Sequence, residues 1–387
     1  MDYAKESIKL HKKLAGKIET ISKVRLKNKI DLSLAYTPGV AEPCLEIAKD
    51  KKKVYDYTIK GNTIAVISDG TAVLGLGDIG PEASLPVMEG KCVLFKQFGG
   101  VNAFPIVLDT KNTEEIIKTI KLISPGFGGI NLEDISAPRC FEIEQRLIEE
   151  LDIPVFHDDQ HGTAIVVLAG IINGLKITKK KKEEVKVIIN GVGAAGVAIA
   201  KLLLHYGIKD IVMVDTVGTI YKGREGLNPV KEMLTDMTNT ACILDPNSKS
   251  CIKGGLQEAM EGRDIFIGVS KGNIVSKKMV ESMNKDPMIF AMANPTPEIS
   301  PDLAYEAGAK IVATGRSDYP NQLNNVLVFP GIFAGALKNK VKKITDEMKI
   351  NAAKNLAEYV KNPNPKKIIP SPFDKGVAKV VAKAIKE

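Results

Sequence analysis

Two pairs of neighbouring acids stand at the ends of apolar runs in the first half of the chain. Glu133 and Asp134 follow one run, and Asp158 and Asp159 follow the next. Ligands of parallel α/β sheets gather at the carboxyl ends of strands, so these two turns can converge. Three carboxylates with open water positions suit Mg²⁺ or Mn²⁺ in octahedral oxygen coordination. Taken singly, Asp159 is better explained as the N-cap of the helix after Gly162 and Glu133 as a solvated loop charge; together with a hydride cofactor, the metal site becomes a reasonable prediction.

Two histidines, His157 and His161, flank the second acid pair in the segment HDDQH. Imidazoles four residues apart occur in some zinc sites, but this segment starts on a strand and no third soft ligand lies nearby. We therefore expect packing or supporting roles for both histidines rather than a zinc site.

A glycine-rich segment, GVGAAG, directly follows the apolar run 185–190 and opens a predicted helix. Gly191 permits a tight turn, Gly193 lets the backbone approach a pyrophosphate, and Gly196 allows close packing of helix on strand. Asp215 ends the next predicted strand, where a carboxylate accepts the ribose hydroxyls of a dinucleotide. The combination favours a dinucleotide site over an unrelated glycine-rich turn.

The residues around Asp215 bear on the choice of dinucleotide. The carboxylate favours NAD, because a 2′-phosphate would meet a negative charge. Lys222 and Arg224 lie close enough in sequence to leave NADP open.

Short apolar runs alternate with helical stretches along most of the chain. Strands are expected at 63–69, 103–109, 128–135, 153–159, 185–190, 211–215, 264–270, 287–294 and 310–315. Helices are expected at 4–24, 86–95, 113–124, 139–150, 163–175 and 191–206, with a helical tail from about 338. This alternation predicts an α/β protein with parallel, doubly wound sheets. We place the domain boundary near 160, giving domains 1–160 and 161–387, with a tail able to fold back on the first domain.

The composition is that of an ordinary globular protein, with 44% apolar and 26% charged residues in 387. The net charge of +8 comes largely from lysine runs that lie beside acids and lack interleaved aromatics, so nucleic-acid binding is not expected. The five cysteines form no metal-binding spacing and are expected to be free thiols in a reducing compartment. The N-terminus has no signal-peptide pattern, and no apolar run approaches the length of a membrane helix. These features predict a cytoplasmic protein with no membrane partner.

Eight segments, in their order and spacing, resemble the small bacterial malic enzymes, over roughly residues 30 to 340. They are YTPGVAEPC (36–44), SDGTAVLGLGDIGPEASLPVMEGK (68–91), FKQFGGVNAFPI (95–106), INLEDI (130–135), FHDDQHGTA (156–164), GVGAAG (191–196), MANPTPE (292–298) and ATGRSDYPNQLNNVLVFPG (313–331). The resemblance implies an N-terminal malic domain, a C-terminal Rossmann-type NAD(P)-binding domain, and a homodimer.

Position by position, the resemblance implies roles for single residues. Tyr36 becomes the general acid, Lys91 the general base, and Asp158 the charge partner of Lys91. The implied metal ligands are Glu133, Asp134 and Asp159. The expected cofactor contacts are Thr163, Gly191, Gly193, Ala194, Ala195, Gly196, Asp215, Ser270 and Asn294, and the expected substrate contacts are Asn294 and Asn325. Without the resemblance, Lys91 would be taken for a surface lysine and Tyr36 for a turn residue.

The implied reaction is the oxidative decarboxylation of L-malate to pyruvate and CO₂ with reduction of NAD(P)⁺. A buried lysine near several charges can be neutral enough to take the hydroxyl proton, and a metal lowers the pKa of that hydroxyl. Three positions depart from the family pattern: Thr71, Asn102 and Ala334 stand where relatives often carry Arg, Asp and Arg. Arg316 is the nearest candidate to grip the substrate carboxylate, and it is equally well explained as a structural ion pair.

Three other functions compete with this interpretation. The same scaffold could carry out malolactic conversion or simple decarboxylation of oxaloacetate. A dinucleotide-sensing regulator is disfavoured by the intact Tyr36, Lys91 and three acids. An amino-acid dehydrogenase would explain the glycine-rich turn but not the carboxylates.

Overall fold

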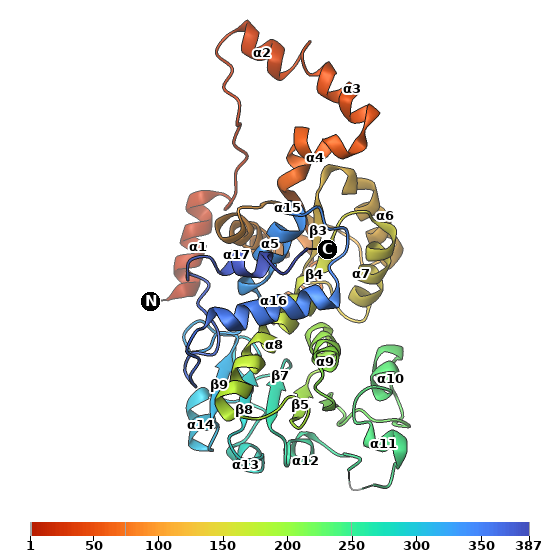
Figure 1. The fold of residues 1–387 in the computed structure, drawn as a ribbon, viewed down its shortest axis with the longest axis vertical. Helices are drawn as coiled ribbons and strands as arrows, with labels where there is room; N and C mark the ends of the chain where they lie inside the picture. Colours follow the sequence, from red (N-terminus) through yellow and green to blue (C-terminus); the bar gives the residue numbers. More distant parts are fainter. Residues whose placement is uncertain (1, 74, 249, 387) are drawn as a thin grey trace.

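The computed structural model describes residues 2–73, 75–248 and 250–386, and it contains two parallel sheets flanked by helices (Figure 1). The strands are short and, apart from the edge strand Asn102–Val107, almost wholly buried, as expected where helices cover both faces of a parallel sheet. The predicted α/β fold class with two parallel sheets is confirmed.

The first sheet has four strands in the order β2-β1-β3-β4. Its strands are β1 (Thr63–Ser68), β2 (Asn102–Val107), β3 (Gly129–Leu132) and β4 (Val155–His157). Its helices are α5 (Pro81–Leu94), α6 (Thr113–Ile123) and α7 (Arg139–Glu150). The apolar faces of α6 and α7 pack with the sheet into one buried cluster, which fixes the strand ends that carry the acid pairs.

The second sheet has five strands in the order β6-β5-β7-β8-β9. Its strands are β5 (Lys186–Asn190), β6 (Asp210–Val214), β7 (Ile265–Gly268), β8 (Met288–Ala291) and β9 (Ile311–Thr314). The chain order reverses between β5 and β7, and in doubly wound sheets ligands bind in the crevice at such a reversal. Helix α9 (Ala194–Tyr206) starts at this crevice.

Helix α8 (Asp158–Thr178) joins the two sheets through the centre of the molecule (Figure 1). It has the length and hydropathy of a membrane span, with a mean hydropathy of 1.4, so the expectation that no apolar run approaches that length is wrong. Its apolar side chains are buried inside the protein, where they pack on α9 and on α16 (Asp346–Tyr359). The helix is therefore the core helix of this fold, and it begins at the second acid pair.

The remaining short elements lie in the connections and at the two ends of the chain. The α-helices are α1 (Tyr3–Leu14), α2 (Lys29–Ala35), α3 (Ala41–Lys49), α4 (Val54–Tyr57), α10 (Pro229–Thr235), α11 (Ala241–Leu244), α12 (Leu256–Met260), α13 (Lys277–Glu281), α14 (Pro301–Glu306), α15 (Phe329–Lys338) and α17 (Val377–Ala382). The other helical turns are η1 (Lys51–Lys53), η2 (Ile59–Asn62), η3 (Phe95–Gly99), η4 (Ser124–Gly126) and η5 (Asn325–Leu327).

The N-terminal segment differs from its prediction. The helix expected over 4–24 ends at Leu14, because Ala15 and Gly16 both take positive φ values, 52° and 121°. An extended stretch then leads to α2 and α3, which stand clear of the body in Figure 1.

The C-terminal helices lie on the first domain. Phe329 of α15 packs against Phe95, with ring centroids 4.6 Å apart, and Phe333 packs against the same ring at 5.5 Å. Helix α17 in turn covers α15. This packing holds the first sheet and the second half of the chain together around α8.

The expectation of five free thiols is wrong for one pair. Cys242 and Cys251 form a disulfide, while Cys44, Cys92 and Cys140 are free. The pairing joins two residues of the long connection between β6 and β7, whose proximity has no signature in the cysteine spacing.

Candidate active site

The two acid pairs converge at the carboxyl edge of the first sheet. Glu133 and Asp134 occupy the turn after β3, and Asp158 and Asp159 form the first turn of α8. Carboxylate oxygens of Glu133, Asp134 and Asp159 lie within 4.8 Å of one another. The backbone N–H of Asp134 donates to Asp159 Oδ2 at 2.8 Å, which fixes one turn against the other.

Lys91 reaches this cluster from α5. Its Nζ lies 2.7 Å from Glu133 Oε1 and 2.7 Å from Asp158 Oδ2, and its side chain is 8% exposed. The ammonium also lies 4.3 Å from the centroid of the Phe329 ring. Burial lowers the pKa of Lys91, but the surrounding carboxylates outweigh burial, and the net pKa is raised.

The cluster carries an excess of negative charge. Four carboxyl groups and one ammonium give a formal charge of −4 + 1 = −3. Burial raises the pKa of Glu133, Asp158 and Asp159, because their charged forms lose hydration. In addition, Asp158 Oδ1 is buried without a hydrogen-bond partner. A divalent cation would offset this charge, and all-oxygen donors suit Mg²⁺ or Mn²⁺. The residues present therefore fit such an ion.

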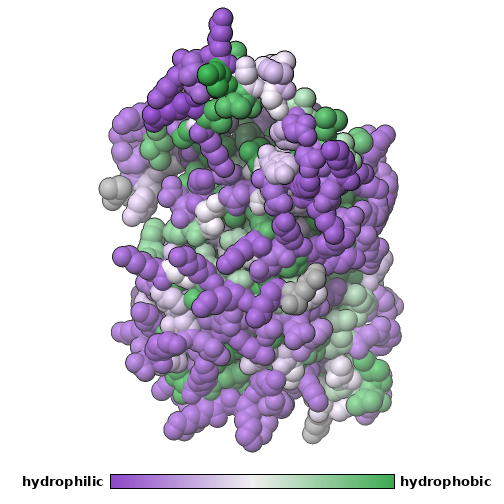
Figure 2. Space-filling view, turned by 45° about the horizontal axis from the view of Figure 1, so that its top comes forward, coloured by the Kyte–Doolittle hydropathy of each residue, from purple (hydrophilic) through white to green (hydrophobic). Residues whose placement is uncertain are grey.

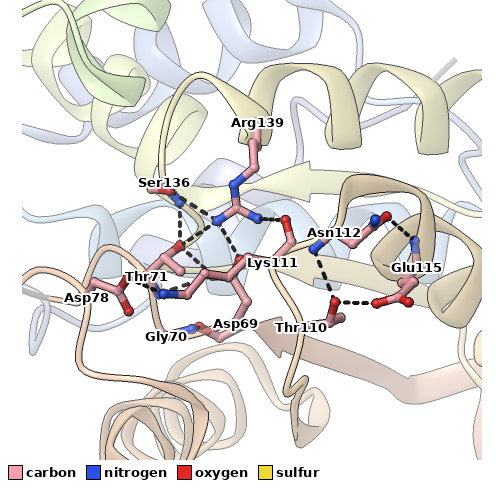
Figure 3. A network of polar contacts seen from close by, with 11 residues as sticks. Asp69, Gly70, Thr71, Asp78, Thr110, Lys111, Asn112, Glu115, Ser136 and Arg139 are labelled. Carbon is pink, nitrogen blue, oxygen red and sulfur yellow. Dashed lines mark hydrogen bonds and ion pairs between the residues drawn. The ribbon is translucent and has the colours of Figure 1, made fainter.

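A polar network braces the turn after β1 against the turn after β3 (Figure 3). The Arg139 guanidinium donates to Asp69 Oδ2 at 2.9 Å and to the Thr71 and Ser136 hydroxyls at 3.2 Å each. The Thr71 hydroxyl donates to Asp69 Oδ1 at 2.6 Å. Sequence reasoning missed this network; its signal was the Ser-Asp-Gly turn at the end of β1, and its arginine partner comes from α7.

The two histidines have supporting roles in this structure. His161 Nε2 lies 2.9 Å from Glu144 Oε2, and the same buried carboxylate accepts the His157 backbone N–H at 2.7 Å. Within the described residues, the metal-competent cluster contains neither histidine. His157 occupies the N-cap position of α8, so the alternative of Asp159 as a helix cap is wrong.

The glycine-rich turn opens a cavity of about 640 Å³ at the reversal of the second sheet. Its walls include Gly191, Gly193, Asp215 and Ser270. Gly191 has a φ of 119°, and a Cβ on Gly196 would lie 1.9 Å from the Gly191 carbonyl oxygen. Ala194, Ala195 and Gly196 form the first turn of α9 and directly follow Gly193 in the cavity wall, and the free N–H groups of a helix N-terminus suit a phosphate.

Asp215 is held by two cations. Arg224 donates to both of its oxygens at 2.9 and 2.6 Å, and Lys231 donates to Oδ2 at 2.6 Å. Lys222 instead pairs with Glu232 and Asp236. The cluster of Asp215, Arg224 and Lys231 thus has a net positive charge.

Loops of the two halves meet between the two sites. A Cβ on Gly75 would lie 2.6 Å from the Asn294 carbonyl oxygen, so the loop after β1 touches the turn after β8. A Cβ on Gly162 would lie 1.9 Å from Asp158 Oδ1 and 3.1 Å from Asn325 Cβ. Asn325 therefore lies beside Asp158 of the acid cluster, while Asn294 is exposed and lies beside Gly75.

Glu298, which the sequence analysis also missed, holds the turns after β7 and β8 together beside the dinucleotide cavity. It is fully buried and accepts the backbone N–H groups of Ser270 and Ala293 at 3.1 and 3.0 Å. Its position at the end of the segment MANPTPE was the available signal. Thr163 lies partly buried in the second turn of α8.

Two residues with a predicted role in catalysis or substrate binding, Tyr36 and Arg316, do not lie at the carboxylate cluster of their own chain. Tyr36 is the C-cap of α2 and is 66% exposed, on the segment that stands clear of the body (Figure 1). Arg316 forms a two-point ion pair with Asp318 at 2.8 and 2.6 Å, which favours its structural explanation.

The chain matches two sequence families. The family described as "Malic enzyme, N-terminal domain" matches residues 15–118 and 110–148, and "Malic enzyme, NAD binding domain" matches residues 160–385. The chain therefore belongs to the malic enzyme family, as the sequence resemblance predicted. Membership confirms a dinucleotide-binding oxidoreductase and removes the amino-acid dehydrogenase alternative.

Alignments with individual relatives cover nearly the whole chain. A bifunctional malic/malolactic enzyme of Bacillus subtilis is 56% identical over 388 residues, covering 100% of this chain and 92% of the relative. An NAD-dependent malic enzyme of Geobacillus stearothermophilus is 56% identical, covering 97% of this chain and 77% of the relative. The crystal structure of an NAD-dependent malic enzyme from Thermotoga maritima superposes with a TM-score of 0.93 at 50% identity, covering 98% of each chain.

Proposed function

We propose that this chain catalyses the oxidative decarboxylation of L-malate to pyruvate and CO₂, with reduction of NAD⁺ and a requirement for Mg²⁺ or Mn²⁺. The observation that carries the proposal is the contact of buried Lys91 with Glu133 and Asp158 inside a carboxylate cluster. The cluster lies where loops from the dinucleotide half reach the malic half.

Glu133, Asp134 and Asp159 would hold the metal, and the crevice at Gly191 and Gly193 would hold the dinucleotide. When bound, the metal supplies Lewis acidity toward the malate oxygens, and the nicotinamide supplies a hydride acceptor for C2. The residues of the chain then have to bind the substrate, exclude water and move two protons.

Lys91 takes the proton from the C2 hydroxyl of malate as hydride leaves C2. A cation at the neighbouring acids favours this step, because it offsets the carboxylates that raise the pKa of Lys91. The β-keto acid loses CO₂ and leaves the enolate of pyruvate, and Tyr36 donates a proton to C3 of this enolate. Lys91 gains one proton and Tyr36 loses one, so proton return from lysine to tyrosine restores both groups and leaves no net proton on the protein.

The proposed cofactor is NAD, with NADP also accepted. Asp215 suits the ribose hydroxyls of NAD. Arg224 and Lys231 already surround this carboxylate, and their net positive charge offers partners to a 2′-phosphate. Similar proteins include the NAD-dependent malic enzyme of Geobacillus stearothermophilus and an NADP-dependent malic enzyme of Escherichia coli, which is 46% identical.

Steady-state kinetics on the purified protein test the proposal. We expect NADH to appear with L-malate, NAD⁺ and Mn²⁺, no turnover after treatment with EDTA, and recovery on adding excess Mn²⁺. Malate-dependent NADH production that is insensitive to metal removal would contradict the assigned site.

A second candidate activity is malolactic conversion, which the named activity of the Bacillus subtilis relative favours. Lactate formed without net reduction of the cofactor in the same assay would identify it. The domain boundary near 160, the homodimer and the cytoplasmic location are likewise part of the proposal. The unmatched interval between residues 148 and 160 supports this boundary.

A further inference from the structure

The polar network around Asp69 is buried, whereas charged and polar side chains cover most of the face of the molecule shown in Figure 2. Exposed ion pairs contribute little to stability. In this network, however, Asp69 is 2% exposed and Thr71 is 8% exposed. Burying such groups is tolerated only where hydrogen bonds satisfy them, so the partners of these two residues are tightly defined.

The backbone of Asp134, on the neighbouring turn, has a conformation that few residues other than glycine adopt. Its φ of 53° lies in the left-handed region. Such residues persist where their surroundings hold them in place, and they cluster at functional sites. Asp134 is one of the three acids that could hold a metal ion, so whatever holds its backbone also sets where one carboxylate of the cluster lies.

Two hydrogen bonds hold the turn of Asp134 against the turn after β1. The N–H of Ala72 donates to the Asp134 carbonyl oxygen at 2.9 Å. The N–H of Ser136 donates to Thr71 Oγ1 at 3.0 Å. The turn is therefore held at Asp134 itself and again two residues further on, in both cases by the adjacent residues Thr71 and Ala72.

The hydroxyl of Thr71 uses its full hydrogen-bonding capacity in this network. A hydroxyl group has one hydrogen to donate and can accept two hydrogen bonds. The Thr71 hydroxyl donates to Asp69 Oδ1 at 2.6 Å, and it accepts from the Ser136 N–H at 3.0 Å and from Arg139 Nη2 at 3.2 Å (Figure 3). The side chain is therefore fixed in one orientation, and its oxygen acts on the turn rather than on an ion.

Arg139 ties this hydroxyl to the other loops at the same edge of the first sheet. It is the first residue of α7, and its guanidinium donates to Asp69 Oδ2 at 2.9 Å and to the Lys111 carbonyl oxygen at 2.8 Å. Asp69 follows β1, Lys111 follows β2, and Arg139 follows the turn after β3. One guanidinium thus joins the three loops.

We propose that Thr71, held by Asp69 and Arg139, is a positioning residue of the metal site, because its hydroxyl fixes the turn that presents the Asp134 carboxylate. This inference rests on the proposed function, in which Asp134 is a metal ligand. Groups that orient metal ligands set the affinity for the metal, and losing one typically weakens metal binding by ~10- to 100-fold. A role in overall packing alone would not weaken Mn²⁺ binding selectively.

Titration of the metal-free, full-length chain with Mn²⁺ tests the proposal, with the EPR signal of the free ion giving the Kd. Thr71→Val keeps the shape of the side chain but removes the hydroxyl, so the Kd for Mn²⁺ should rise ~10-fold or more. Thr71→Ser keeps the hydroxyl, and its Kd should be close to that of the wild type. The Kd for NADH, measured by fluorescence, should stay unchanged in both variants, because the bonds of the network all lie within residues 69–139.

Arg139→Met provides a second variant in case Thr71→Val does not fold, since the Arg139 side chain is 24% exposed. Its Kd for Mn²⁺ should also rise ~10-fold. The matched control is Arg146→Met on the same helix. The Arg146 side chain is 32% exposed and pairs with Glu114 and Glu142 on the surface, so this variant should keep the wild-type Kd.

The outcomes separate this inference from the proposed function. A wild-type chain that does not bind Mn²⁺ would overturn the proposed metal site, and the positioning role with it. If the wild type binds Mn²⁺ and folded Thr71→Val or Arg139→Met binds it equally well, only the positioning role is overturned. The same holds if Thr71→Ser binds as weakly as Thr71→Val, or if the variants lose NADH binding in the same measure as Mn²⁺ binding.

Discussion

At the scale of single residues, Lys91 provides the sharpest prediction. Replacing it by Met keeps much of the side-chain volume but removes the proton acceptor, so kcat should fall by ~10²- to 10⁴-fold. The matched control is Lys60→Met, because Lys60 is also 8% exposed but donates to backbone carbonyls at 3.3 and 3.0 Å and lies over the Tyr55 ring, with no carboxylate among these contacts. The control should lose stability and keep its kcat. Equal kcat values for the two variants would remove Lys91 from the mechanism.

Asp215 predicts a pH dependence of stability. Burial alone would raise its pKa, but the hydrogen bonds from Arg224 and Lys231 outweigh burial and lower it below the ordinary value of 3.8. A lowered pKa contributes stability that is present above the unfolded pKa and lost as the pH falls below it.

At about pH 7, Asp215→Asn should therefore reduce the free energy of unfolding by about 1 to 3 kcal/mol, since it removes the carboxylate that pairs with two partly buried cations. The difference from wild type should narrow as the pH is lowered from about 5 toward 3. Urea unfolding at several pH values measures this difference. Asp318→Asn, at an exposed ion pair with Arg316, should leave the stability close to that of the wild type. A difference for Asp215→Asn that does not vary with pH would argue against the ion cluster.

At the scale of elements, two glycines of the same turn should respond differently to alanine. A Cβ on Gly196 would lie 1.9 Å from the Gly191 carbonyl oxygen, so Gly196→Ala must push α9 from β5 and cost about 1 to 3 kcal/mol. A Cβ on Gly193 would meet nothing within 4 Å, and its φ of −89° is allowed for alanine.

Gly193→Ala should then change stability by less than about 0.5 kcal/mol. It should still raise the Kd for NADH ~10-fold, because the added methyl group faces the place of the pyrophosphate. Thermal unfolding and NADH fluorescence measure the two effects separately. Unchanged NADH binding by Gly193→Ala would place the dinucleotide elsewhere.

Elements with a strong local pattern were predictable from the sequence. The strand observed at 186–190 was predicted within a residue of its bounds, and the helix after the glycine turn ends at Tyr206 as predicted, although it begins at Ala194. The N-terminal helix was overextended, because apolar residues continue at helical spacing past Ala15, where the backbone turns left-handed. The partners of Asp69 and Asp215 come from distant or irregular segments, so no local pattern identifies them.

At the scale of the whole molecule, the metal site should couple to stability. The cluster joins the turn after β3 to the first turn of the central helix α8, so an ion bound there stabilises the folded chain. At an Mn²⁺ concentration of about 100 times its Kd, the stabilisation should be about 2.7 kcal/mol. Thermal unfolding with and without Mn²⁺ measures it, and Asp159→Asn should lose most of the effect. An equal response of the variant would mean that Mn²⁺ acts at another site.

The most direct test of the account is the stoichiometry of Mn²⁺ binding. The metal-free protein is titrated with Mn²⁺, and the EPR signal of the free ion measures how much Mn²⁺ remains unbound. We predict one tightly bound ion per wild-type chain and no tight binding by Glu133→Gln or Asp159→Asn. Tight binding that survives both substitutions would contradict the assignment of these acids as the metal site.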